Sequence, residues 1–154
     1  MAYMDTMTGL GNRTAFLEEN KSNAIFPGMI SYIMMDANNL KTINDTLGHN
    51  KGDELIITIA KCMRKAVGHN GQCYRIGGDE FVIILKNKTA AETEEIINKV
   101  RCEIEFADKQ SDITISVAIG YVWTDTEQKN LEDLMQHADD EMSVSYTHLR
   151  AHET

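Results

Sequence analysis

Residues Tyr74–Leu85 read YRIGGDEFVIIL, and two β-prone runs in this segment flank a pair of glycines. Such a pair predicts a tight β-hairpin, because glycine adopts a positive φ without a steric penalty from Cβ. Side chains alternate along a strand, so Asp79 and Glu80 are expected on opposite faces of the second strand, at the hairpin tip. Taken alone, the pattern is interpreted as a hairpin with an acidic edge.

Composition and charge narrow the class of protein. The chain has 154 residues, 42% of them hydrophobic and 25% charged, which fits one globular domain with a substantial core. A net charge of −9 argues against nucleic acid or an anionic membrane surface as the main partner. This net charge does not exclude a nucleotide as ligand, because a bound divalent cation can offset the negative charge of its phosphates. No apolar run approaches the roughly 20 residues of a membrane span, so we expect no direct membrane contact.

The cysteines indicate the compartment. Cys62, Cys73 and Cys102 are odd in number and lack Cys-x-x-Cys spacing. They are therefore expected to be reduced, mostly buried thiols of a cytoplasmic protein, with no disulfide framework and no zinc site.

Hydrophobic periodicity predicts the remaining elements. The first half is predicted to contain a helix that begins after Asn12 as its cap and ends at Pro27-Gly28, a buried strand over 29–35 followed by Asp36, a short helix within 36–53, and a helix over 53–67. The hairpin comes next. After it, the sequence predicts a helix over 89–107 capped by Thr89, a strand over 113–123, and a final helix over 131–142. This order predicts one α/β (α+β) domain over 1–142, with helices that cover a mostly antiparallel sheet.

Two strand-terminal carboxylates suggest a site. Asp36 and Asp79 both close apolar strands, so they converge if these strands are neighbours in the sheet. A pair of oxygen ligands suits Mg²⁺, which takes the rest of its ligands from water and substrate phosphates. With Lys41 and backbone amides nearby, this set would suffice for metal-assisted nucleotidyl transfer. The structural alternative is that Asp36 caps a strand end and Asp79 is an ordinary hairpin acid.

Several ordered motifs resemble the GGDEF family, the diguanylate cyclases. The motif that names the family is intact at Gly77–Phe81. Asp5–Arg13 (DTMTGLGNR) is similar to its N-terminal motif, with Met7 in place of leucine. Asp36–Asp53 (DANNLKTINDTLGHNKGD) fits the family pattern, as do Thr114–Gly120 and Ala138-Asp139. The resemblance covers about residues 5–142.

The resemblance implies a fold and a reaction. The fold would be a sheet like that of polymerase palms and nucleotidyl cyclases, with the active site on the Gly-Gly hairpin. The reaction would condense two GTP molecules into cyclic di-GMP and release two pyrophosphates. Each subunit of a transient homodimer would present one GTP, and two Mg²⁺ or Mn²⁺ ions per active site would support the transfer.

Roles in the site follow from motif position. Metal ligands would be Asp36, the Ala37 carbonyl, Asp79 and Glu80, with the catalytic base open between Asp79 and Glu80. The residues that would bind the substrate are Asn39, Leu40, Lys41, Asn44, Asp53, Gly77, Gly78 and Arg150. Among them, Asn39, Leu40 and Lys41 would bind the phosphates. Asn44 and Asp53 would bind the guanine base. As structural alternatives, Asn44 caps a turn, Asp53 is the N-cap of the next helix, and Lys41 is a solvated surface residue.

Two departures from the family pattern bear on activity. Residues 68–71 read GHNG where many members carry an Arg-x-x-Asp product-inhibition motif, so no feedback inhibition is expected through that site. Residues 143–154 are atypical for the family, with Tyr146 where a phosphate-binding lysine belongs, and are interpreted as a non-native tail that is foreign, truncated or frame-altered. The alternative function is therefore a weak or inactive GTP-binding regulatory module, and a dimerisation domain comes third. A sensor domain upstream of this chain is also expected.

Overall fold

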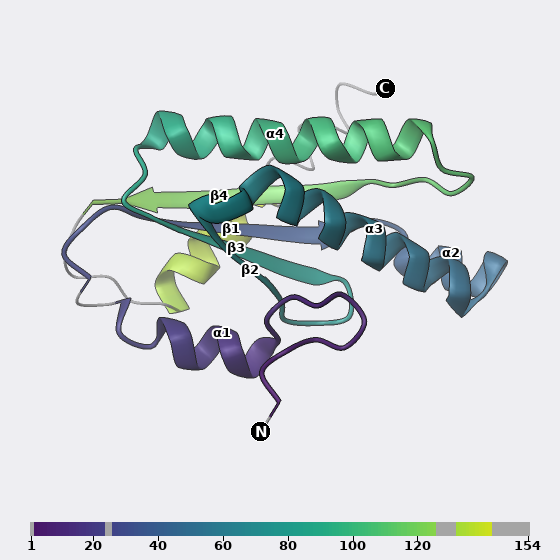
Figure 1. The fold of residues 1–154 in the computed structure, drawn as a ribbon, viewed down its shortest axis with the longest axis horizontal. Coiled ribbons are helices and arrows are strands. Elements are labelled where there is room, and N and C mark those ends of the chain that lie inside the picture. The colour runs from purple at the N-terminus through teal and green to yellow at the C-terminus, as the bar shows by residue number, and fades with distance from the viewer. Residues whose placement is uncertain (1, 24–25, 126–131, 143–154) are drawn as a thin grey trace.

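The computed structural model describes residues 2–23, 26–125 and 132–142 (Figure 1). In chain order the elements are α1 Arg13–Asn20, β1 Ile30–Ala37, α2 Leu40–Leu47, α3 His49–Val67, the 3₁₀ helix η2 Gly68–Asn70, β2 Gly71–Arg75, β3 Glu80–Lys86, α4 Ala90–Lys109, β4 Val117–Thr124, and a helix over 132–142. The predicted mixed α/β architecture is confirmed.

One four-stranded sheet organises the molecule, in the order β2-β3-β1-β4. Every neighbouring pair is antiparallel, as the sequence predicted for most of the sheet. The two most apolar strands, β1 and β3, lie at its centre, which explains their nearly continuous hydrophobic runs. As a result, the C-terminal end of β1 meets the N-terminal end of β3.

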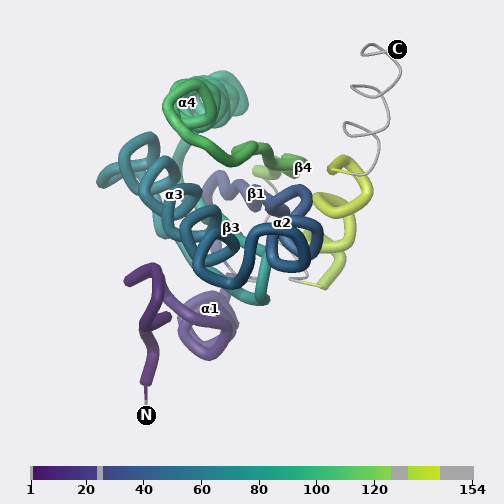
Figure 2. Tube along the Cα trace, turned by 90° about the vertical axis from the view of Figure 1, so that its right-hand side faces the viewer, coloured from purple at the N-terminus to yellow at the C-terminus, as the bar shows by residue number. Residues whose placement is uncertain are grey.

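Helices cover the two faces of this sheet unequally (Figure 2). On one face, α3 and α4 pack against side chains such as Ile33, Met35 and Phe81. On the other face, α1 and the 132–142 helix pack against a second cluster that includes Met34 and Val82. Neighbouring positions along each strand point to opposite faces, so each central strand contributes to both cores.

Both predicted helix caps are confirmed. The Asn12 side chain accepts a hydrogen bond from the Ala15 amide at 2.9 Å, and this sets the start of α1. Thr89 and Glu92 form a capping box at the start of α4, in which each side chain accepts from the other residue's amide. Such caps satisfy amides that the first helical turn leaves without partners.

Two helix boundaries differ from the prediction. Helix α1 ends at Asn20, well before Pro27, because the buried Asn20 side chain donates to the Phe16 carbonyl and Asn23 in turn donates to Asn20. Helix α3 begins at His49 rather than at Asp53, because Gly48 at φ 92° ends α2 and starts α3 directly. The alternative in which Asp53 is an N-cap is therefore wrong.

The last strand and the hairpin loop also differ. Strand β4 begins at Val117 rather than Ile113, because the segment before it is held as a loop: the Ile115 amide donates to the Asp108 side chain at 2.9 Å. The hairpin has a four-residue loop over 76–79, and neither of its glycines has a positive φ. The predicted reason for the Gly-Gly pair is thus wrong.

All three cysteines are free, as expected. Cys62 is buried and Cys73 half-buried, but Cys102 is exposed on α4, which corrects the expectation of mostly buried thiols. Within the described ranges, no helix is long and apolar enough to cross a membrane.

Candidate active site at the ends of β1 and β3

The antiparallel register of β1 and β3 brings the acidic hairpin to Asp36. Asp36 lies directly opposite Glu80, so the two side chains share a face of the sheet. Asp79 precedes the strand and lies in the loop rather than on its opposite face. The Ala37 amide donates to the Asp79 carbonyl with an N···O distance of 2.8 Å. This bond fixes the hairpin tip against the end of β1, and the expected convergence of the two segments is present.

Asp36 is held in an unfavourable electrostatic environment. Burial raises its pKa to about 6, and neighbouring carboxylates add to the effect, in the order Asp79, Glu80 and Asp139. Its Oδ1 atom is buried and has no hydrogen-bond partner among the described residues. A buried carboxylate oxygen without a donor is costly unless a cation compensates it.

The donor set fits a hard divalent cation. The Ala37 carbonyl belongs to the last residue of β1, beside Asp36, and Asp79 and Glu80 lie across the strand pair. Over the described part of the chain, no group of three or more His, Cys, Asp or Glu side chains is already arranged to hold a metal. Mg²⁺ tolerates such a site because it retains waters and uses substrate phosphates as ligands.

The segment after β1 forms a tight turn into α2. Asn39 adopts φ 67° at the N-cap position without a side-chain cap hydrogen bond. The Asn38 side chain donates to Ser116 Oγ at 2.9 Å, which ties this turn to the loop before β4. The amides of Leu40 and Lys41 lie in the first helical turn, where the helix offers them no acceptor. This is the geometry in which backbone amides bind phosphate.

The two predicted guanine-binding residues lie on adjoining helices. Asn44 is on α2 and half-buried, and Asp53 is on α3 and exposed. A Cβ at Gly52 would overlap Asn44 Oδ1, so the absence of a side chain at Gly52 leaves room for the present conformation of Asn44. The sequence did not reveal this contact.

Arg75 holds the hairpin loop in place. Its guanidinium donates to the Gly78 carbonyl at 2.9 Å and forms an ion pair with Asp5 at 3.3 Å. The Ile76 and Gly77 amides both point to the Glu80 carbonyl, at 2.9 and 3.4 Å. The N-terminal segment and the glycine loop are thus linked by one arginine.

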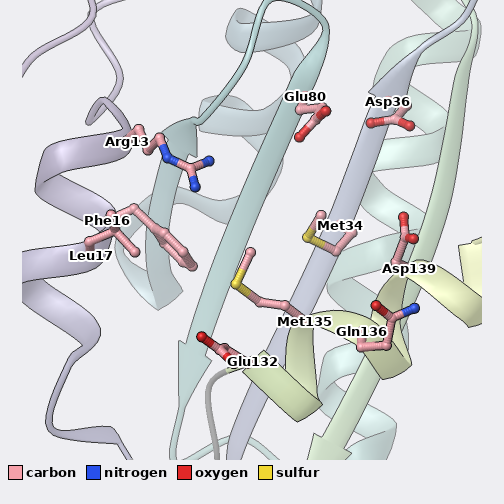
Figure 3. A pocket seen from close by; sticks show the side chains of 10 residues that line it. All are labelled: Arg13, Phe16, Leu17, Met34, Asp36, Glu80, Glu132, Met135, Gln136 and Asp139. Atoms are coloured by element: carbon pink, nitrogen blue, oxygen red, sulfur yellow. The ribbon is translucent and has the colours of Figure 1, made fainter.

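A cleft of about 520 Å³ opens beside Asp36 and Glu80, between α1 and the 132–142 helix (Figure 3). Three charged residues to which the sequence assigned no role in the site also line it, namely Arg13, Glu132 and Asp139, and the first and last of these are the most informative. Arg13 reaches in from the start of α1, and Asp139 points from the 132–142 helix toward Asp36. Both belong to the quoted motifs, which is the only sequence signal that could have drawn attention to them.

Two predicted features fall elsewhere. Arg150 and the atypical tail over 143–154 lie outside the described residues. The segment at 68–71 is described, and a Cβ at Gly71 would overlap the Ile84 carbonyl. A side chain at this position would require the backbone to move, and the absence of feedback inhibition through this site stays a prediction.

Comparison with known proteins identifies the family. The family model described as "Diguanylate cyclase, GGDEF domain" matches residues 2–150. The chain belongs to the GGDEF family. A cyclic di-GMP phosphodiesterase, PdeB of Shewanella oneidensis, is 28% identical over 90% of this chain and 16% of its own length. Diguanylate cyclase DgcN of Escherichia coli is 32% identical over 92% of this chain and 36% of its own length.

A solved GGDEF domain is similar in fold. The GGDEF domain of DgcB from Caulobacter crescentus, crystallised in complex with c-di-GMP, is 25% identical with a TM-score of 0.85. The match covers 96% of this chain and 91% of that one. The chain spans only 16% and 36% of the length of these two curated relatives.

Proposed function

We propose that this chain is a diguanylate cyclase domain that condenses two GTP molecules into cyclic di-GMP and two pyrophosphates. The observation that carries the proposal is Asp36, whose buried Oδ1 has no hydrogen-bond donor among the described residues and whose side chain shares a face with Glu80. The reaction is inferred from membership of the GGDEF family. The carboxylates around Asp36 would bind the metal ions that this reaction needs.

Each part of the site has a task in this reaction. Asp36, Asp79, Glu80 and the Ala37 carbonyl would hold two Mg²⁺ or Mn²⁺ ions. When bound, such ions increase the acidity of the attacking 3′-hydroxyl and neutralise charge on the α-phosphate and leaving group. The Asn39 and Leu40 amides with Lys41 would bind phosphates, and Gly77 and Gly78 would keep the hairpin loop free of bulk near the nucleotide. Asp79 or Glu80 would accept the hydroxyl proton.

Guanine recognition would come from the helices beyond the strand ends. The Asp53 carboxylate can accept from guanine N1–H and N2–H₂, while Asn44 can both donate and accept. Because a cyclic dinucleotide contains two nucleotides, two such sites must face each other, and we infer a transient homodimer with one GTP on each subunit. Arg150 remains a proposed phosphate contact of the C-terminal segment.

The test is product formation from GTP and Mg²⁺ at high protein concentration, with products separated by chromatography. Cyclic di-GMP should form at a rate that rises with the square of enzyme concentration while dimers are rare. Asp79→Ala and Glu80→Gln should reduce the rate by at least about 100-fold, because they remove proposed metal ligands and the candidate base. Glu105→Gln on α4 removes an equivalent charge far from the cleft and should leave the rate unchanged.

The second candidate is a GTP-binding regulatory module that does not turn over. The match to PdeB, which is named for the breakdown of cyclic di-GMP, shows that GGDEF sequences also occur in proteins not named as cyclases. Saturable, metal-dependent GTP binding without product would favour this alternative. If the protein neither binds GTP nor makes product, both candidates fail and a dimerisation domain remains.

A further inference from the structure

Arg13 has no side-chain partner among the described residues, although it lines a cleft rich in carboxylates. Four acidic residues line the cleft, namely Asp36, Glu80, Glu132 and Asp139, and Arg13 is the only basic residue among the described ones that do so. Arg75, nearby, is paired with Asp5, but within the described ranges Arg13 makes no ion pair or side-chain hydrogen bond. Because the Arg13 guanidinium forms no ion pair with these acids, its N–H donors are available to a ligand.

The base of this side chain is held firmly. Arg13 is the first residue of α1, directly after the Asn12 cap. Gly11 accepts the Arg75 amide at 2.8 Å, and a Cβ on Gly11 would press into the Tyr74 ring at 2.6 Å. The start of α1 is therefore fixed against β2, so the guanidinium reaches the cleft from a defined position (Figure 3).

Arg13 also lies between the cleft and the hairpin loop. It lines a second hollow of about 230 Å³, together with Gly77 and Gly78. An anion that extends from Asp36 and Glu80 past the hairpin would pass this guanidinium. The positive end of the α1 dipole lies at the same place and favours the same charge.

We propose that Arg13 binds a phosphate group of the nucleotide in this cleft, an inference that rests on the proposed function. Once divalent cations neutralise the carboxylates, the cleft favours an anion, and a guanidinium can donate two parallel hydrogen bonds to phosphate oxygens. Arg13 thereby contributes to substrate affinity from the side opposite the 132–142 helix.

The test measures metal and nucleotide binding separately. Mn²⁺ alone is titrated by electron paramagnetic resonance, and the Mn²⁺ complex of α,β-methylene-GTP, which cannot release pyrophosphate, is titrated by calorimetry. Arg13→Met should weaken nucleotide binding by about tenfold or more, the usual scale for a lost charge-assisted hydrogen bond. It should leave Mn²⁺ binding unchanged or tighter, because a positive charge leaves an acidic cleft.

Two further variants sharpen the result. Arg13→Lys keeps the charge without the planar fork and should bind the nucleotide with intermediate affinity. Arg101→Met removes an exposed arginine from α4, on the other side of the sheet, and should bind like the unmodified protein.

The opposing outcomes are distinct. Unchanged nucleotide affinity in Arg13→Met overturns the role of Arg13 but leaves the proposed function intact. A parallel loss of Mn²⁺ and nucleotide affinity indicates a structural role and also overturns the inference. If the unmodified protein does not bind the analogue at all, the proposed function fails and the inference fails with it.

Discussion

The two faces of the sheet are built from the same strands, yet they differ in chemistry. Under α3 and α4 the fully buried side chains are aliphatic or thioether groups apart from Phe81 and Cys62, and the one tyrosine among the described residues that pack against this core, Tyr121, is only partly buried. Under α1 and the 132–142 helix, the cluster includes Tyr32 and Tyr74, whose hydroxyl groups need polar partners. Asn23 donates to the Tyr32 hydroxyl at 2.6 Å, and the Tyr74 hydroxyl donates to Gln72 at 2.6 Å.

The two faces therefore contribute to different properties, one to the stability of the fold and the other to ligand binding. The face under α3 and α4 is closed, and burial of apolar surface there stabilises the fold. The other face has shorter covering helices and leaves a cleft, in which the described part of the chain offers Asp36 Oδ1 no hydrogen-bond donor. An uncompensated carboxylate is tolerated on a face that a ligand can complete, at the expense of stability in the unliganded protein. Substitutions on the two faces should therefore affect different measurements.

The largest effect on stability is expected from Phe81→Ala. Phe81 is 0% exposed under α3 and α4, and its removal should lower the free energy of unfolding by about 3–5 kcal/mol. Phe106, 60% exposed on α4, is the matched control, and Phe106→Ala should change it by less than about 0.5 kcal/mol. Urea denaturation measures both. Similar losses in the two variants would contradict a closed core on this face.

A smaller effect is expected from Gly120→Ala on the open face. A Cβ at Gly120 would overlap the backbone of Met142 and Ala138, so the 132–142 helix must move away from β4. Overpacking of this kind costs about 1–3 kcal/mol. Because the displaced helix carries Asp139, Mn²⁺ affinity should fall as well. Gly78→Ala meets open space and is the control for stability, and equal urea midpoints in the two variants would argue against the close helix contact.

Sequence patterns were sufficient for the scaffold. Apolar runs located β1 and β3, and Asn12 and Thr89 marked two helix starts, because these signals act within a few residues. Boundaries failed where distant contacts decide them. Ile113 and Ile115 have strand-like composition, yet they are buried as a loop that Asp108 and Ser111 hold.

The candidate site was predictable only through its motifs. Spacing alone left Asp36 and Asp79 open to structural interpretations, and the register of β1 against β3 was needed to bring them together. Arg13 and Asp139 escaped attention because nothing local distinguishes an unpaired charge from a solvated one. Their placement depends on how α1 and the 132–142 helix cross the sheet.

The smallest effect on stability concerns Asp36 and pH. Burial and then the Asp79, Glu80 and Asp139 charges raise its pKa from 3.8 to about 6 in the folded, metal-free protein. The folded state therefore binds this proton more tightly than the unfolded state does. The stabilisation is complete below about pH 4 and is lost as pH rises through about 6. Since Asp36 is only half-buried, solvent screening should keep the change below about 1 kcal/mol.

Asp36→Asn tests this difference between the faces directly. The variant cannot ionise at this position, so its free energy of unfolding should vary less between pH 4 and 6.5 than that of the unmodified protein. Asp140→Asn, an exposed carboxylate on the 132–142 helix, should retain the original slope. At pH 7, Mg²⁺ should stabilise the unmodified protein and Asp140→Asn but not Asp36→Asn, because a ligand stabilises only the state that binds it. Equal slopes and equal Mg²⁺ responses in all three proteins would show that Asp36 is no more strained than a surface acid.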